Sequence, residues 1–150
     1  MIRFSQIAHN VRPLFPKLTA YFAAHRDVEF AYIFGSYGIE KETPMSDVDI
    51  AVSLKQIVPQ DRYFDLRLEF MSDIVQILKT NEVDVIILNN ADLILAYHTV
   101  SSRKLLFERD PAIRIVYETR ILDRYFDSEP IRRIQQEYFK EHIQQGVIFG

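Results

Sequence analysis

The sequence predicts an α/β (α+β) fold in which a small mixed sheet is flanked by helices. Short apolar runs typical of strands alternate along the chain with longer segments whose apolar residues recur at helical spacing. The chain has 150 residues, the size of one ordinary domain with a full core. We therefore expect residues 1–150 to form a single domain, in which 127–150 is either a C-terminal helix or a partner-binding tail.

The N-terminal part is expected to contain a helix followed by a strand. Apolar residues recur at helical spacing over residues 4–25, although Pro13 and Pro16 must kink or divide that helix. Residues 29–34 (EFAYIF) are aromatic and β-branched, as in a buried strand, and this run ends at Gly35.

The middle of the chain predicts a second strand and a long helix. Residues 37–41 favour a short helical turn, which Thr43-Pro44 ends. Residues 47–54 (DVDIAVSL) alternate with period two, so this strand begins with two aspartates. Residues 61–79 form the clearest helical pattern, with six apolar side chains on one face: Tyr63, Leu66, Phe70, Ile74, Ile77 and Leu78.

The remaining elements follow the same alternation. A third strand is expected at residues 83–88 (VDVIIL), and it carries one acid, Asp84. The last segment, residues 131–143, places Ile134, Tyr138 and Phe139 toward one side. Between them we expect a helix over residues 91–101 with Asn90 as its N-cap, an extended piece over 104–108 and a helix over 111–126.

Composition excludes several classes of function. The net charge of −3 provides no global basic field for nucleic acid, so direct nucleic-acid binding is not expected. Without cysteine the chain has no disulfide, no thiolate nucleophile and no cysteine-ligated zinc. No apolar run approaches the ~20 residues that span a bilayer, and the N-terminus lacks the apolar core of a secretory signal. We expect a cytoplasmic protein.

The strongest signal is Gly35-Ser36 followed, after ten residues, by Asp47-Val48-Asp49. Residues i and i+2 of a strand point to the same face, so Asp47 and Asp49 are expected to project together while the even-numbered side chains enter the core. Glycine allows close backbone approach to a phosphate, and Ser36 offers a hydroxyl and an N–H group. The pattern indicates a site for a metal-bound triphosphate.

Asp84 extends this site to a second strand. A carboxylate inside an apolar run costs several kcal/mol or stays protonated unless it is compensated, and a metal ion supplies that compensation. Three carboxylates without histidine or cysteine favour Mg²⁺ over zinc or copper. Two ions ~3.5–4 Å apart would serve phosphoryl transfer in such a site.

This pattern resembles the nucleotidyltransferase superfamily of the DNA polymerase β type, and more narrowly the minimal nucleotidyltransferase (MNT) group. In that group Gly-Ser-x10-Asp-x-Asp is the usual form, and a serine precedes the first aspartate, as Ser46 does here. The resemblance covers roughly residues 28–126 and implies the polymerase β-like fold. Many members have Ala-Arg where this chain has Gly38-Ile39, and Lys41 is a weak substitute for that arginine.

The resemblance also implies a role for each residue of the pattern. Gly35 and Ser36 would bind the triphosphate of ATP, the co-substrate. Asp47 and Asp49 would hold both Mg²⁺ ions. Asp84 would ligate the ion that activates the acceptor hydroxyl, and would help to remove its proton.

MNT proteins are similar to the antitoxin half of HEPN/MNT toxin–antitoxin pairs. The implied function is transfer of AMP from ATP to a tyrosine hydroxyl of a cognate HEPN ribonuclease toxin, which neutralises the toxin within a hetero-oligomer. Only 24 residues follow Phe126, too few for a second substrate-binding domain, so we expect a partner protein to supply the acceptor.

Several alternatives stay open. Asp47 and Asp49 also suit a solvated turn that caps a strand, and Asp84 suits a hydrogen-bonded carboxylate at a strand end. Within the same chemistry, the chain is compatible with an aminoglycoside-type nucleotidyltransferase. A different class of function is an antitoxin that acts by stoichiometric binding alone, with residues 131–143 as one contact surface.

Overall fold

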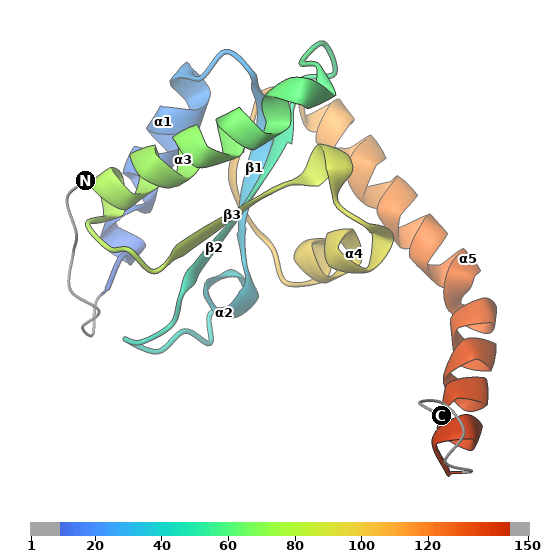
Figure 1. Ribbon diagram of the computed structural model, residues 1–150. Coiled ribbons are helices and arrows are strands. Elements are labelled where there is room, and N and C mark those ends of the chain that lie inside the picture. The colour runs from blue at the N-terminus through green and yellow to red at the C-terminus, as the bar shows by residue number, and fades with distance from the viewer. Residues whose placement is uncertain (1–9, 145–150) are drawn as a thin grey trace.

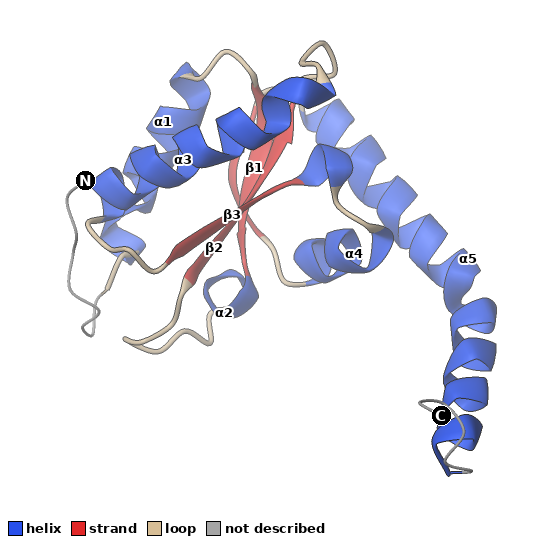
Figure 2. Ribbon diagram, in the orientation of Figure 1, coloured by secondary structure: helices blue, strands red, loops and turns tan. Residues whose placement is uncertain are grey.

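The computed structural model describes residues 10–144, in which one four-stranded sheet carries helices on both faces (Figures 1 and 2). The strands are β1 (Val28–Phe34), β2 (Val48–Leu54), β3 (Val83–Ile87) and β4 (Lys104–Glu108). The helices are α1 (Phe15–Ala24), α2 (Gly35–Gly38), α3 (Tyr63–Leu78), α4 (Leu93–Ser101) and α5 (Pro111–Gln144), with short 3₁₀ turns at Arg12–Leu14, Gln60–Arg62 and Leu88–Asn90. The predicted fold class is confirmed.

The sheet is mixed, with strand order β3-β2-β1-β4. β1 runs antiparallel to both β2 and β4, whereas β2 and β3 are parallel. Phe34, the last residue of β1, lies opposite Asp49 of β2, and Asp49 in turn lies beside Asp84 of β3. The topology therefore brings three distant parts of the motif to one end of the sheet.

The two faces of the sheet bury different sets of side chains. Val48, Ile50 and Val52 of β2 pack into the larger core with side chains of α1 and α3. Ala51 faces the other way and packs with Phe30 and Tyr32, against which Tyr117 of α5 lies. The alternation expected for the second strand is thus confirmed.

The C-terminal region differs from the expectation of two segments. A single helix, α5, runs from Pro111 to Gln144 and passes through Pro130. Arg132 bridges this point, because its guanidinium lies 3.7 Å from the ring centroid of Tyr125 and donates a hydrogen bond of 2.6 Å to the Tyr125 carbonyl. The segment beyond Phe126 is therefore a continuation of one helix as far as Gln144, and residues 145–150 of the expected tail lie outside the described residues.

Helix starts also differ in detail. The N-cap of α4 is Asp92, whose carboxylate accepts a hydrogen bond of 2.8 Å from the Leu95 N–H, rather than Asn90. Pro13 sits in the first 3₁₀ turn and Pro16 in the first turn of α1, where a missing N–H costs little. Residues 4–9 of the expected first helix lie outside the described range. Among the described helices, none has both the length and the apolar character needed to cross a membrane.

Candidate active site

The Gly35 turn presses directly against Asp49. Gly35 has a φ of +67°, in the left-handed region that favours glycine. A Cβ atom at this position would lie 2.5 Å from Asp49 Oδ2, closer than any real contact. Two independent constraints therefore require glycine where β1 ends. We call Gly35, Asp47, Asp49 and Asp84 the acid end of the sheet.

The connection between α4 and β4 braces this turn from behind. The Gly35 N–H donates a hydrogen bond of 3.2 Å to Ser102 Oγ, and the Ser102 hydroxyl donates one of 2.9 Å to the His98 carbonyl. A Cβ atom at Gly38 would lie 1.7 Å from the Ser102 carbonyl oxygen. This contact explains why glycine stands at position 38, since alanine would force the Ser102 backbone to move.

Asp49 is the most perturbed carboxylate of the acid end. Burial, together with the negative charges of Asp84 and Asp47, raises its pKa to about 6. Asp47 is exposed and lies one residue before β2, so the strand begins at Val48 rather than at the first aspartate. The three predicted acids therefore act on one another electrostatically, as expected of carboxylates that share a site.

Asp84 lies on the edge strand β3 with 56% of its side chain exposed. The desolvation cost expected for a carboxylate in VDVIIL therefore does not arise, and that part of the argument for a metal was wrong. The odd-numbered residues Val83 and Val85 are buried instead. Asp84 still lies in register with Asp49, at the position that the motif predicts.

Arg67 of α3 holds Asp84 in place, and sequence reasoning did not identify it. One guanidinium nitrogen lies 3.1 Å from Asp84 Oδ1, and Nε donates a hydrogen bond of 2.6 Å to the Val85 carbonyl. Arg67 follows the buried Leu66 in α3. The pattern of this helix does not indicate that Arg67 contacts β3. Ser102 was also missed, because it is 67 residues from Gly35 in the sequence.

The acid end fits magnesium by donor chemistry. All of its side-chain ligands are carboxylate oxygens, and a divalent cation would offset the repulsion that raises the Asp49 pKa. Within residues 10–144, however, no three acidic, histidine or cysteine side chains gather closely enough to hold a metal ion as they stand.

A family model matches the part of the chain that contains the whole sheet. Residues 16–112 match the family model described as polymerase beta, nucleotidyltransferase, and this range contains all four residues of the acid end and Ser36. No curated protein matches the chain.

Several solved structures share the fold. A toxin–antitoxin structure with AMP-PNP has a TM-score of 0.64 and 18% identity, over 85% of this chain and 98% of that chain. A tyrosine-to-alanine mutant of the MntA–HpeT toxin–antitoxin pair has a TM-score of 0.66 and 20% identity, over 83% of this chain and 94% of that chain. A complex of a tri-AMPylated HEPN toxin from Shewanella oneidensis with an MNT antitoxin has a TM-score of 0.62 and 18% identity, over 85% and 98%.

Proposed function

Because this chain belongs to the polymerase beta nucleotidyltransferase family, we propose that it transfers AMP from ATP to a tyrosine hydroxyl of a cognate HEPN toxin and thereby neutralises that toxin. The likeness to toxin–antitoxin structures, one with AMP-PNP and one with an AMPylated toxin, supports this choice of nucleotide and partner. We place the reaction in the cytoplasm, where ATP is abundant.

The observation that carries the proposal is the contact between the Gly35 turn and Asp49. A phosphate that approaches the half-buried backbone of this turn comes next to a carboxylate whose pKa is raised by burial and by the charges of Asp84 and Asp47. Such an arrangement suits a ligand that brings both phosphate oxygens and a cation. A site for a neutral substrate would not require a glycine turn beside a carboxylate with a raised pKa.

Each residue of the proposed transferase site has a separate role. Gly35 would let the triphosphate approach the backbone closely, and Ser36 would hold it through its backbone N–H group and hydroxyl. Ser102, which accepts the Gly35 N–H, would keep the turn in shape. Asp47 and Asp49 would bind two Mg²⁺ ions, and Asp84 would bind the ion beside the acceptor. When bound, these ions would supply charge stabilisation for the attacking oxygen and for the pyrophosphate. Asp84 is open to solvent and can also accept the tyrosine proton.

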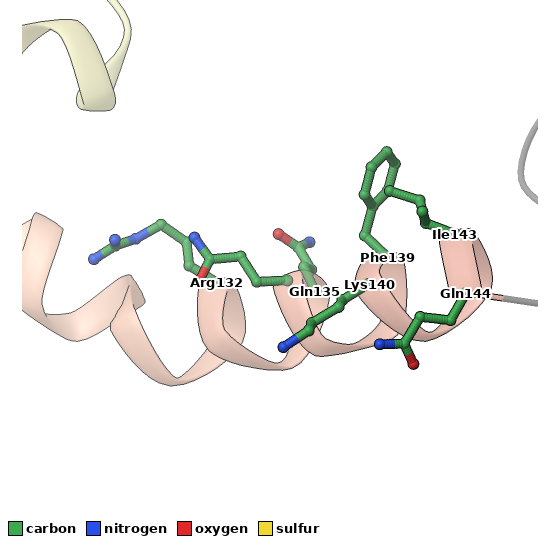
Figure 3. A pocket seen from close by; sticks show the side chains of 7 residues that line it. Arg132, Gln135, Phe139, Lys140, Ile143 and Gln144 are labelled. Carbon is green, nitrogen blue, oxygen red and sulfur yellow. The ribbon is translucent and has the colours of Figure 1, made fainter.

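The outer half of α5 offers a surface for the partner. Phe139 is 51% and Ile143 52% exposed, and Figure 3 shows their side chains next to each other on one side of the helix, with Lys140 and Gln144 directed elsewhere. Ile131, Ile134 and Tyr138 are exposed as well. Exposed apolar side chains that gather on one helix are typical of a protein contact surface.

The test is incubation of the protein with Mg²⁺, α-labelled ATP and the HEPN protein encoded beside it. We expect label on the partner with the wild type and none with Asp47→Ala/Asp49→Ala. The matched control is Asp61→Ala/Asp65→Ala, which also removes two carboxylates, here both exposed, but leaves the acid end intact. Label transfer by the Asp47→Ala/Asp49→Ala variant would refute the assigned site.

One observation favours a second candidate, neutralisation by binding alone. Asp84 is paired with Arg67, and the described acids do not converge on one point. If the Asp47→Ala/Asp49→Ala variant protects cells from the toxin as well as the wild type, and no label reaches the toxin with either, stoichiometric binding is the function. An aminoglycoside-type activity would instead place label on the small molecule without any partner protein.

A further inference from the structure

A cavity of about 560 Å³ lies between α5 and the sheet, at the end where β1 begins and β2 ends. This is the opposite end from the acids, because Phe30 of β1 pairs with Ser53 of β2 while Phe34 pairs with Asp49. Figure 1 shows the first half of α5 running past the sheet on this side. We call this space the α5 cavity, and the lining residues used below are Glu29, Phe30, Ser53, Tyr117, Arg120 and Arg124.

A bulge in β1 turns Glu29 into the α5 cavity. Val28 and Phe30 pair with Leu54 and Ser53, which are consecutive, so Glu29 is the extra residue of an irregular register. Bulges of this kind re-aim a side chain. Glu29 is only 9% exposed, and its carboxylate makes no hydrogen bond or ion pair with any residue of the described range. Its carboxylate oxygens are not among the fully buried unpartnered atoms of the described residues, so they are open to a donor from a ligand in the cavity.

Tyr117 supplies a second unpartnered polar group. Its hydroxyl is fully buried and has no hydrogen-bond partner among residues 10–144. The Tyr117 ring packs at 5.5 Å from the ring of Phe30, so the floor of the cavity is aromatic. Burial raises the pKa of Tyr117 to about 12, against the effect of the Arg120 charge, so the hydroxyl keeps its proton.

Two arginines on α5 complete the cavity. Arg120 and Arg124 lie one helical turn apart and form no ion pair or hydrogen bond within the described part of the chain. Arg114 on the same helix shows the contrast, since it pairs with both Glu108 and Glu118. No ion pair joins Glu29 to either cavity arginine, so the opposite charges face a space rather than each other.

We propose that the α5 cavity binds a guanine nucleotide. The Watson–Crick edge of guanine presents two adjacent N–H donors, which one carboxylate such as Glu29 accepts together, whereas the same edge of adenine presents one. A purine ring suits the aromatic floor, and the phosphate suits two unpaired guanidinium groups. The α5 cavity is separate from the proposed transferase site, so this inference does not depend on the proposed function.

The test is calorimetric titration of the full chain with GMP, with AMP and guanosine as comparison ligands. We expect GMP to bind at least about tenfold more tightly than either, because AMP lacks one donor and guanosine lacks the charge-assisted contacts. Glu29→Gln should remove the preference for GMP over AMP, and Arg124→Gln should weaken GMP binding about tenfold. Arg133→Gln is the matched control, since Arg133 is an exposed arginine of α5 that pairs with Glu129 outside the cavity.

Three outcomes would overturn the inference. If the folded wild-type chain does not bind GMP at about 1 mM, the cavity is not a guanine-nucleotide site. GMP binding that Asp47→Ala/Asp49→Ala abolishes and Arg124→Gln leaves intact would assign the nucleotide to the acid end. Equal binding of AMP and GMP would remove the role of Glu29. Thermal melting of each variant identifies any that merely unfold, and Tyr117→Phe serves as a second probe that leaves every charge in place.

Discussion

At the acid end of the sheet, the like charges of Asp47, Asp49 and Asp84 act on one another, and within residues 10–144 the outermost of them, Asp84, forms an ion pair with Arg67. At the opposite end, Glu29 lies across a cavity from two arginines that it does not contact. The carboxylates of the acid end repel one another and would be stabilised by a cation. The cavity at the opposite end holds a carboxylate and two guanidinium groups apart, and would suit a ligand that carries both hydrogen-bond donors and negative charge. We propose that the two ends of one small sheet bind different ligands for different electrostatic reasons.

The largest effect is expected from Gly35→Ala. A side chain there meets Asp49 Oδ2 at 2.5 Å and must adopt a φ of +67°. We expect a loss of about 1–3 kcal/mol in the free energy of unfolding and a fall in transfer activity of at least about 100-fold. Denaturant unfolding and the label-transfer assay measure the two effects. Tolerance of alanine with full activity would show that the turn does not approach the substrate.

Arg67→Ala should act more narrowly. Loss of the contacts to Asp84 and to the Val85 carbonyl frees the third acid, and we expect affinity for Mn²⁺, used as a spectroscopic substitute for Mg²⁺, to fall about 10-fold. Electron paramagnetic resonance titration measures this directly. Arg67→Lys should recover part of the affinity, and Arg133→Ala should change nothing. Tighter Mn²⁺ binding in Arg67→Ala would mean instead that the arginine competes with the ion.

Asp49 makes stability depend on pH. Its folded-state pKa of about 6 lies above the ordinary value of 3.8, so ionisation disfavours the folded state and stability falls as pH rises between these values. Asp49→Asn should therefore stabilise the protein at pH 8 by about 1–2 kcal/mol, with little effect at pH 3–4. Mg²⁺ should raise the melting temperature of the wild type more at pH 8 than at pH 5. An Asp49→Asn effect that is independent of pH would contradict this account.

The smallest effect is expected at the other end of the sheet. Tyr117→Phe removes a buried hydroxyl that has no partner in the described range, so stability should be unchanged or rise by up to about 1 kcal/mol. Urea unfolding resolves a change of this size. A loss of more than about 1 kcal/mol in the free energy of unfolding would reveal a hydrogen bond of the Tyr117 hydroxyl, for example to an ordered water. The hydroxyl would then already have a partner.

Much of the acid end follows from the sequence because its signals are local. The period of two predicts which face of β2 carries Asp49, and the Gly35-Ser36 pair directly after an apolar run indicates a turn at the end of β1. Arg67 and Ser102 were out of reach, since their contacts join segments that only the topology brings together. The bulge at Glu29 was also hidden, because a register shift leaves no mark in an apolar run.

The continuous α5 was missed for another reason. Pro130 lies inside α5, where proline removes one backbone hydrogen bond and crowds the preceding turn. The side chain of Arg132 reaches back over Tyr125 and supports the helix across that point. Local propensity was therefore overruled by a contact between side chains two turns apart.

The most direct test of the central claim is the mass of the toxin after incubation with this protein, ATP and Mg²⁺. We predict that the wild type adds one or more AMP groups to a tyrosine of the toxin, and that Asp49→Asn, folded and still bound to the toxin, adds none. An unmodified toxin that is nevertheless fully neutralised by the wild type would contradict the account.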